Sequence, residues 1–359
     1  MILLRHIIHK SRLFTHLLFL VALNLFSGCE NRQKIEIADI YTRAVLAACG
    51  TTEFPEFESS LLQFPRSRDL KLTPTEINMS LVDFFSLGDC ELQALVAERN
   101  NALGRVMTPS NVLLYEHQFL LKAESCLTVM LRDSTENANL ILQLKEAIQV
   151  KRQNKPVVFW NTTFANPELS GVFSLAKTIG TNRTDVESTA SAMQTVAEFY
   201  NAFGMIESDI DLGPSFQILQ SSAAVTTTLK KLERLTFALN HVATALETRM
   251  QERPVCVDGV RDREANELIG LFKSYYIKRL QPEMAQYQHY ANALLTAIET
   301  LTTHTKSIMP PAFKQYYAAN LSMYNEESIL QKFRDAVRRH SSSWQAVLDA
   351  CGLTPGDLL

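Results

Sequence analysis

Hydrophobic positions in the second half of the chain recur at alternating spacings of three and four residues. One series consists of Leu232, Leu235, Leu239, Val242 and Leu246, and the other of Tyr287, Ala291, Leu294, Ile298 and Leu301. This period places apolar side chains on one stripe of a helix, and such helices pack against each other at crossing angles of roughly 20°. The pattern predicts an all-α fold, a multi-helix antiparallel bundle with long helices.

The first half predicts a helical hairpin over residues 89–131. Its helices run from about 89 to 103 and from about 109 to 131, with Thr108 as N-cap and Pro109 at the first helical position. Folding the two helices back on each other about Thr108 places Cys90 opposite Cys126. The hairpin therefore predicts a disulfide that ties its open ends and restricts the unfolded chain.

Other residues indicate where further helices begin and end. Thr184 and Glu187 have the spacing of a capping box. Gly213-Pro214 and Pro310-Pro311 are breaks, and Gly352 is a predicted C-terminal cap. The run at 157–160 is interpreted as a buried connector. The predicted domains are a signal peptide at 1–28, an N-terminal helical region at 29–155 and a long-helix bundle at 156–359, with the last two left open as one continuous domain.

The N-terminal apolar segment predicts the cellular location of the protein. Basic residues precede Leu13–Leu25, which is shorter than the about 20 apolar residues of a spanning helix. Ser27 and Gly28 then precede Cys29, as in a bacterial lipoprotein signal whose cysteine is diacylated. Ordinary secretion or an uncleaved anchor is the alternative.

The residue after the cysteine indicates in which membrane the lipoprotein would be anchored. Glu30 stands where many inner-membrane lipoproteins have aspartate. We therefore expect a lipid-anchored protein of the cell envelope, on the periplasmic face of the outer membrane. Its predicted partners are the membrane, through the anchor at Cys29, and an envelope protein.

The remaining cysteines indicate an oxidising compartment rather than a metal site. None has a zinc-like spacing, and exported proteins favour disulfides. With Cys90 and Cys126 paired by the hairpin, elimination pairs Cys256 with Cys351. Cys49 is left as a buried, inert thiol, because no neighbour in sequence would lower its pKa.

One charged position stands on an apolar helix face. Arg99 follows Leu92 and Val96 along the first hairpin helix, and reflection about Thr108 brings it near Glu116. A buried guanidinium requires a partner. We predict an Arg99–Glu116 ion pair that sets the register of the hairpin, with a ligand or catalytic site as the alternative.

Composition excludes several classes of function. The formal net charge is −3, and no basic run with interleaved aromatics indicates nucleic-acid binding. No nucleotide loop, nucleophile elbow or zinc-protease motif occurs. His241, His289, His304 and His340 lack the helical spacing of a metal pair. We therefore expect no cofactor, no metal and no catalytic residue, and favour a non-enzymatic role.

Several short motifs carry a resemblance. They are Cys90-Glu91-Leu92, Ala97-Glu98-Arg99-Asn100, Leu103-Gly104-Arg105-Val106, Pro109-Ser110, Tyr115-Glu116, Cys126-Leu127, Phe64-Pro65, Arg68-Asp69-Leu70, Phe159-Trp160-Asn161, Tyr275-Tyr276, Leu280-Gln281-Pro282, His340, Trp344-Gln345 and Cys351-Gly352. Together they resemble a family of uncharacterised proteobacterial lipoproteins, domain of unknown function 3080, over most of the mature chain. The resemblance implies export and lipidation, and it implies no activity or catalytic residue.

Three functions are consistent with the sequence. The favoured one is a non-enzymatic, lipid-anchored module that contacts other envelope components. The second is a periplasmic binder of a small or apolar ligand between helices. The third is an envelope hydrolase that uses Glu98, Glu116 and Arg99. An apolar cavity would favour the binder, convergent carboxylates the hydrolase, and an exposed apolar patch the interaction module.

Overall fold

The structure is a computed structural model, and it describes residues 36–51, 53–77, 90–132, 138–177, 181–205 and 210–358. The predicted signal peptide at 1–28 and Cys29 lie outside the described residues. Ile37–Leu359 forms one compact unit. No helix in the described ranges is long and apolar enough to cross a membrane.

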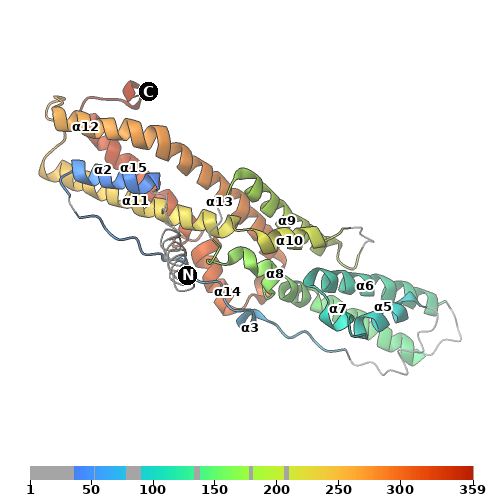
Figure 1. Ribbon diagram of the computed structural model, residues 1–359. Helices are drawn as coiled ribbons and strands as arrows, with labels where there is room; N and C mark the ends of the chain where they lie inside the picture. Colours follow the sequence, from blue (N-terminus) through green and yellow to red (C-terminus); the bar gives the residue numbers. More distant parts are fainter. Residues whose placement is uncertain are drawn as a thin grey trace, which may run out of the picture. The chain divides into compact units, whose positions relative to one another are not determined.

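The described residues fold mainly into helices (Figure 1). The α-helices are α2 (Ile37–Ala48), α3 (Ser67–Leu70), α5 (Glu91–Asn100), α6 (Pro109–Met130), α7 (Ala138–Thr162), α8 (Pro167–Ser170), α9 (Arg183–Ala202), α10 (Gly213–Ser221), α11 (Ala224–Glu252), α12 (Arg263–Leu271), α13 (Gln281–Thr302), α14 (Pro311–Tyr316) and α15 (Ile329–Ala350). Shorter or wider turns are η1 (Gly104–Val106), η2 (Gly171–Phe173), η3 (Phe272–Leu280), η4 (Thr303–Ile308), η5 (Tyr317–Leu321) and η6 (Pro355–Leu358). In the described ranges, a bridge between Val257 and Val260 is the only β-pairing.

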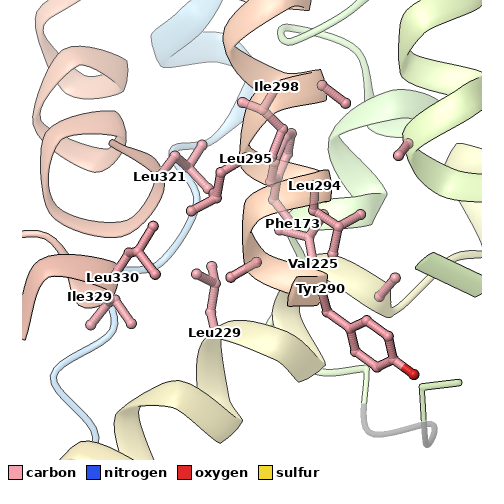
Figure 2. Packing of buried hydrophobic residues seen from close by; sticks show 14 of the residues in the cluster. Phe173, Val225, Leu229, Tyr290, Leu294, Leu295, Ile298, Leu321, Ile329 and Leu330 are labelled. Carbon is pink, nitrogen blue, oxygen red and sulfur yellow. The ribbon is translucent and has the colours of Figure 1, made fainter. Parts of the chain in front are cut away.

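The two predicted seams lie on α11 and α13, and the all-α prediction is confirmed. α11 packs against α2, α13 and α15, so the longest helices share one core. All five members of the α11 seam are fully buried. Figure 2 shows part of this core, where Leu229 of α11, Leu295 of α13 and Leu330 of α15 lie with Leu321 of η5.

The predicted hairpin is present as α5 and α6, and the Cys90–Cys126 disulfide ties its open ends as predicted. Thr108 is the N-cap, and its hydroxyl accepts a hydrogen bond from the Asn111 amide at 3.4 Å. α5 ends at Asn100, earlier than predicted, and the chain turns through η1. α7 also packs against α6, which makes the hairpin part of a three-helix unit.

The second predicted bridge is present, because Cys256 pairs with Cys351. It joins the loop before α12 to the residue that caps the C-terminus of α15. Gly352 follows with a φ of 65°, the left-handed conformation expected of a C-terminal cap. Among the residues that the structure describes, Cys49 is the free cysteine, and it is half-buried.

The structure corrects the prediction for residues 157–160. The run at 157–160 is not a connector but the last part of α7, and Pro156 lies inside that helix. Packing outweighs the cost of the proline here, since Phe159 and Trp160 are fully buried. The predicted boundary between 155 and 156 consequently falls within a helix.

The capping box of α9 lies two residues before the predicted pair of Thr184 and Glu187. Asn182 and Asp185 form it reciprocally, with hydrogen bonds of 3.0 and 3.2 Å. Asparagine is an N-cap as effective as threonine, and aspartate serves at the third position. Glu187 instead pairs with the Arg183 guanidinium at 2.7 Å.

An extended segment links α2 to the three-helix unit. We call residues 53–77 the strap; α3 is its only helix. Side chains of the body hydrogen-bond to its backbone. Asn161 and Asn154 each accept from the backbone N–H and donate to the carbonyl of one strap residue, Leu72 and Thr75, at 2.7–2.9 Å.

A third asparagine makes the same pair of hydrogen bonds to the strap. Asn320 of η5 accepts from the Leu62 N–H at 3.3 Å and donates to the Leu62 carbonyl at 2.8 Å. Trp160 donates its indole N–H to the Leu70 carbonyl at 2.7 Å. Side chains thus supply the partners that a neighbouring β-strand would otherwise provide to an extended backbone.

Candidate functional site

A buried polar cluster joins α2 to α15. The Tyr41 hydroxyl lies 2.8 Å from His340 Nε2, and the Trp344 indole N–H donates to that hydroxyl at 2.7 Å. All three side chains are at most 1% exposed. His340 and Trp344 lie one turn apart on α15, so one helix face presents both to Tyr41.

The hydrogen-bond roles assign the protons in this cluster. An indole N–H only donates, so the Tyr41 oxygen accepts from Trp344. The Tyr41 proton is then available to His340 Nε2, which also lies 3.2 Å from the Trp344 nitrogen. Nε2 is therefore an acceptor, and neutral His340 carries its proton on Nδ1. Nδ1 is buried and has no hydrogen-bond partner among the described residues.

Burial keeps this cluster uncharged. Desolvation lowers the pKa of His340 to about 3, because the imidazolium form would lose its hydration. Desolvation also raises the pKa of Tyr41 well above its ordinary value, and a hydrogen bond from Trp344 opposes that shift. At neutral pH the cluster is therefore a network of neutral dipoles.

A pocket of about 330 Å³ adjoins the cluster, and Trp344 belongs to both. Its lining residues are Phe272, Tyr276, Ile277, Gln281, Ser341, Trp344, Gln345 and Leu348. They come from η3, the start of α13 and the face of α15. The volume lies at the small end of the range for ligand sites.

The wall formed by η3 is a π-helix, a wider helix that occurs frequently at functional sites. It directs aromatic rings toward α15. The Phe272 ring centroid lies 4.4 Å from that of Trp344, and the Tyr276 centroid lies 4.5 Å from that of His340. The pocket is therefore backed by stacked rings and by the buried hydrogen bonds behind them.

The predicted Arg99–Glu116 ion pair is wrong, since the structure gives Glu116 another partner. The ammonium group of Lys151, on α7, lies 2.7 Å from both oxygens of the Glu116 carboxylate. The prediction considered only the two helices of the hairpin, and the third helix supplies this cation. The Arg99 guanidinium instead donates to the Gly104 carbonyl and lies 5.7 Å from the centroid of the Tyr115 ring.

Glu98 and Cys49, which the sequence analysis also considered, do not form a reactive site. Glu98 is exposed on α5. Burial raises the pKa of the Cys49 thiol to about 11, and the nearby Arg249 charge opposes that shift only in part. A thiol with such a pKa is a poor nucleophile at neutral pH. No group of three or more His, Cys, Asp or Glu side chains in the described ranges is placed to hold a metal ion.

A second buried histidine stabilises a turn. His117 Nδ1 accepts a hydrogen bond at 2.9 Å from the Gly204 amide, just after α9. Gly204 has a φ of 69°, and a Cβ there would press on Leu120. Desolvation, with the nearby Lys155 charge, lowers the pKa of His117. This histidine is therefore a neutral structural link between α6 and α9.

Sequence reasoning missed the Tyr41 cluster and the pocket. Tyr41 and His340 lie 299 positions apart, and no local pattern relates them. The available signal was the pair of His340 and Trp344 at a spacing of four on an apolar face. That spacing indicates a shared helix face, although it does not identify the partner.

Comparison with known families gives one match. The model of a family described as "Protein of unknown function (DUF3080)" matches residues 39–355. The match includes residues 39–48 of α2, the strap, both disulfides and every residue that lines the pocket. No curated protein and no solved structure matches the chain.

Proposed function

The chain belongs to this family of proteins of unknown function, and on that premise we propose that it is a lipid-anchored envelope protein that binds an apolar ligand in the pocket between η3 and α15. The pocket carries the proposal. None of its eight described lining side chains is charged, and buried aromatic rings form much of its surface. Such a site favours an apolar group over a charged one.

The same geometry favours binding over hydrolysis. A hydrolase site needs convergent acid and base groups, and Glu98, Glu116 and Arg99 do not lie among the pocket residues. His340, which belongs to the cluster behind the pocket, is kept neutral by burial. The cluster behind the pocket thus supports its wall, since it fixes Trp344 through the Tyr41 hydroxyl.

The proposed address rests on Cys29 and is supported by the disulfides. Bridges such as Cys256–Cys351 form and persist in oxidising compartments, as the periplasm is. Ile37 is the eighth residue after Cys29, and a fully extended chain of that length spans less than about 30 Å. Diacylation of Cys29 would thus hold α2, and Tyr41 with it, near the outer membrane.

Metabolic labelling with radioactive palmitate tests the address. The full-length protein should incorporate label, and Cys29→Ala should lose it. Cys49→Ala is the matched control and should remain labelled. Label retained by Cys29→Ala would overturn the lipidation proposal while leaving the pocket proposal intact.

The apolar fluorophore N-phenyl-1-naphthylamine tests the pocket. The purified protein should enhance its fluorescence saturably, and Ser341→Phe, which places a ring at the pocket mouth, should weaken binding at least tenfold. Ser342→Phe is a matched control, because Ser342 is also exposed on α15 and does not line the pocket. Equal binding by both variants would refute the pocket proposal.

A second candidate function rests on the turn between α5 and α6. Leu103 is 80% exposed and Val106 is 76% exposed. The turn that carries them is built firmly, since Asn101 Oδ1 accepts from the Gly104 amide at 2.8 Å. Large aliphatic side chains held in water favour contact with a protein partner.

A charge substitution distinguishes this candidate. Leu103→Asp with Val106→Asp should abolish labelling of envelope neighbours by a proximity label fused to the anchored protein. The same double variant should bind N-phenyl-1-naphthylamine normally. An unchanged set of labelled neighbours would contradict a docking role for the turn.

A further inference from the structure

The pocket between η3 and α15 changes from apolar to polar between its floor and its mouth. Phe272, Tyr276, Trp344 and Leu348 are buried and form the floor. Rings at the floor are in mutual contact, with 5.1 Å between the centroids of Phe272 and Tyr276. A ligand that fills the floor must therefore present an apolar group.

The mouth of the pocket is polar and uncharged. Gln281, Ser341 and Gln345 line it, and all three are exposed. The Gln345 amide donates to the Asp349 carboxylate at 2.7 Å, which turns its nitrogen toward that partner. The mouth thus offers amide and hydroxyl groups to a ligand, and its lining residues supply no cation for an anionic head group.

The pocket has room for an apolar chain of moderate length. About 330 Å³ corresponds to roughly eleven water molecules at ~30 Å³ each. One hydrocarbon chain of roughly ten carbons suits such a space, since a methylene group and a water molecule have similar volumes.

We infer that the ligand is a single-chain amphiphile with an uncharged, hydroxyl-bearing head group. This inference rests on the proposed binding function and names the class of ligand for the same pocket. The chain lies against Phe272 and Trp344, and the head group accepts and donates hydrogen bonds at Gln281, Ser341 and Gln345. A monoacylglycerol has this chemistry.

Competition against bound N-phenyl-1-naphthylamine tests the inference. The competitors share a twelve-carbon chain and are 1-monolaurin, laurate and dodecyltrimethylammonium, each used below its critical micelle concentration. Monolaurin should displace the fluorophore at a concentration at least tenfold lower than either charged competitor. Displacement by laurate at an equal or lower concentration would overturn the inference.

Variants with charged residues at the mouth of the pocket provide a second test of the inference. Gln281→Lys combined with Gln345→Lys should shift the preference toward laurate at least tenfold, because ammonium groups would then meet the carboxylate. Gln217→Lys is the control, as Gln217 is exposed on α10 away from the pocket. An unchanged preference in the double variant would place the head group elsewhere and overturn the inference.

The outcomes separate the inference from the proposal beneath it. If the fluorophore binds and no amphiphile displaces it, the ligand class is wrong and the pocket proposal stands. If the fluorophore itself does not bind, both are overturned.

Discussion

The side-chain clamps on the strap predict a measurable cost for removing one of them. Asn154 and Asn161 lie two turns apart on one face of α7, and they hold Thr75 and Leu72. Seven helical residues rise about 10.5 Å at 1.5 Å each. Three extended residues span about 10 Å at ~3.3 Å each. The helix and the strap therefore match in length, and both clamps form without distortion.

Asn154→Leu removes one clamp while retaining the approximate size of the side chain. It deletes two hydrogen bonds, of 2.9 and 2.7 Å. Each contributes about 1 kcal/mol net, so the free energy of unfolding should fall by about 2 kcal/mol. Since Thr75 is exposed, water can replace part of what is lost, which makes this figure an upper one.

Urea denaturation and amide hydrogen exchange measure this effect. The urea midpoint should fall at nearly constant slope, and the Thr75 amide should exchange at least tenfold faster. Asn201→Leu is the matched control, because Asn201 is an exposed helical asparagine on α9, and it should change neither quantity. Unchanged stability with unchanged Thr75 exchange in Asn154→Leu would refute the clamp.

Two further predictions concern stability. Replacing both cysteines of the Cys256–Cys351 bridge with Ala should lower the free energy of unfolding, measured by urea denaturation, by about 4.7 kcal/mol. The same replacement at Cys90–Cys126 should lower it by about 3.8 kcal/mol, because the sequence separations are 95 and 36. Equal losses would contradict the argument from loop length. Burial lowers the pKa of His340 from 6.5 to about 3. Between these pH values the unfolded chain binds a proton at this residue and the folded protein does not, so the free energy of unfolding falls as the pH falls. Relative to His340→Gln, the natural chain should lose about 1.4 kcal/mol more per pH unit between pH 6 and pH 4, and parallel curves would show that His340 is not buried and neutral.

Local patterns predicted the elements that depend on local chemistry. The α11 seam has the period of a helix that buries one face, and Thr108 followed by Pro109 satisfies the start of α6 without tertiary help. The Cys90–Cys126 bridge also followed, because two helices joined by a short turn must run antiparallel. Each of these inferences needs only residues that are close in sequence or related by one turn.

The errors came from partners outside the segment under consideration. Lys151 on α7 pairs with Glu116 and displaces the predicted role of Arg99. Phe159 and Trp160 gain enough burial to keep α7 helical beyond Pro156. Local propensity cannot reveal such packing, since it depends on which distant element lies alongside.

The pocket was beyond prediction for the same reason. Its floor requires η3 and α15 to lie side by side, and its support requires Tyr41 from α2. Three distant segments must meet before the aromatic residues become a site. The sequence places tyrosines at 275, 276, 287 and 290, and aromatic residues at helical spacing indicate core packing rather than a pocket.

The fluorescence of Trp344 tests the central claim most directly, because this side chain forms part of the pocket and the chain has only two tryptophans. Trp160→Phe removes the other one, which lies away from the pocket against Leu70. In that variant, N-phenyl-1-naphthylamine should quench Trp344 saturably, with the same midpoint as the rise in fluorophore emission. A fluorophore that binds while Trp344 emission stays constant would occupy another site and would contradict the account.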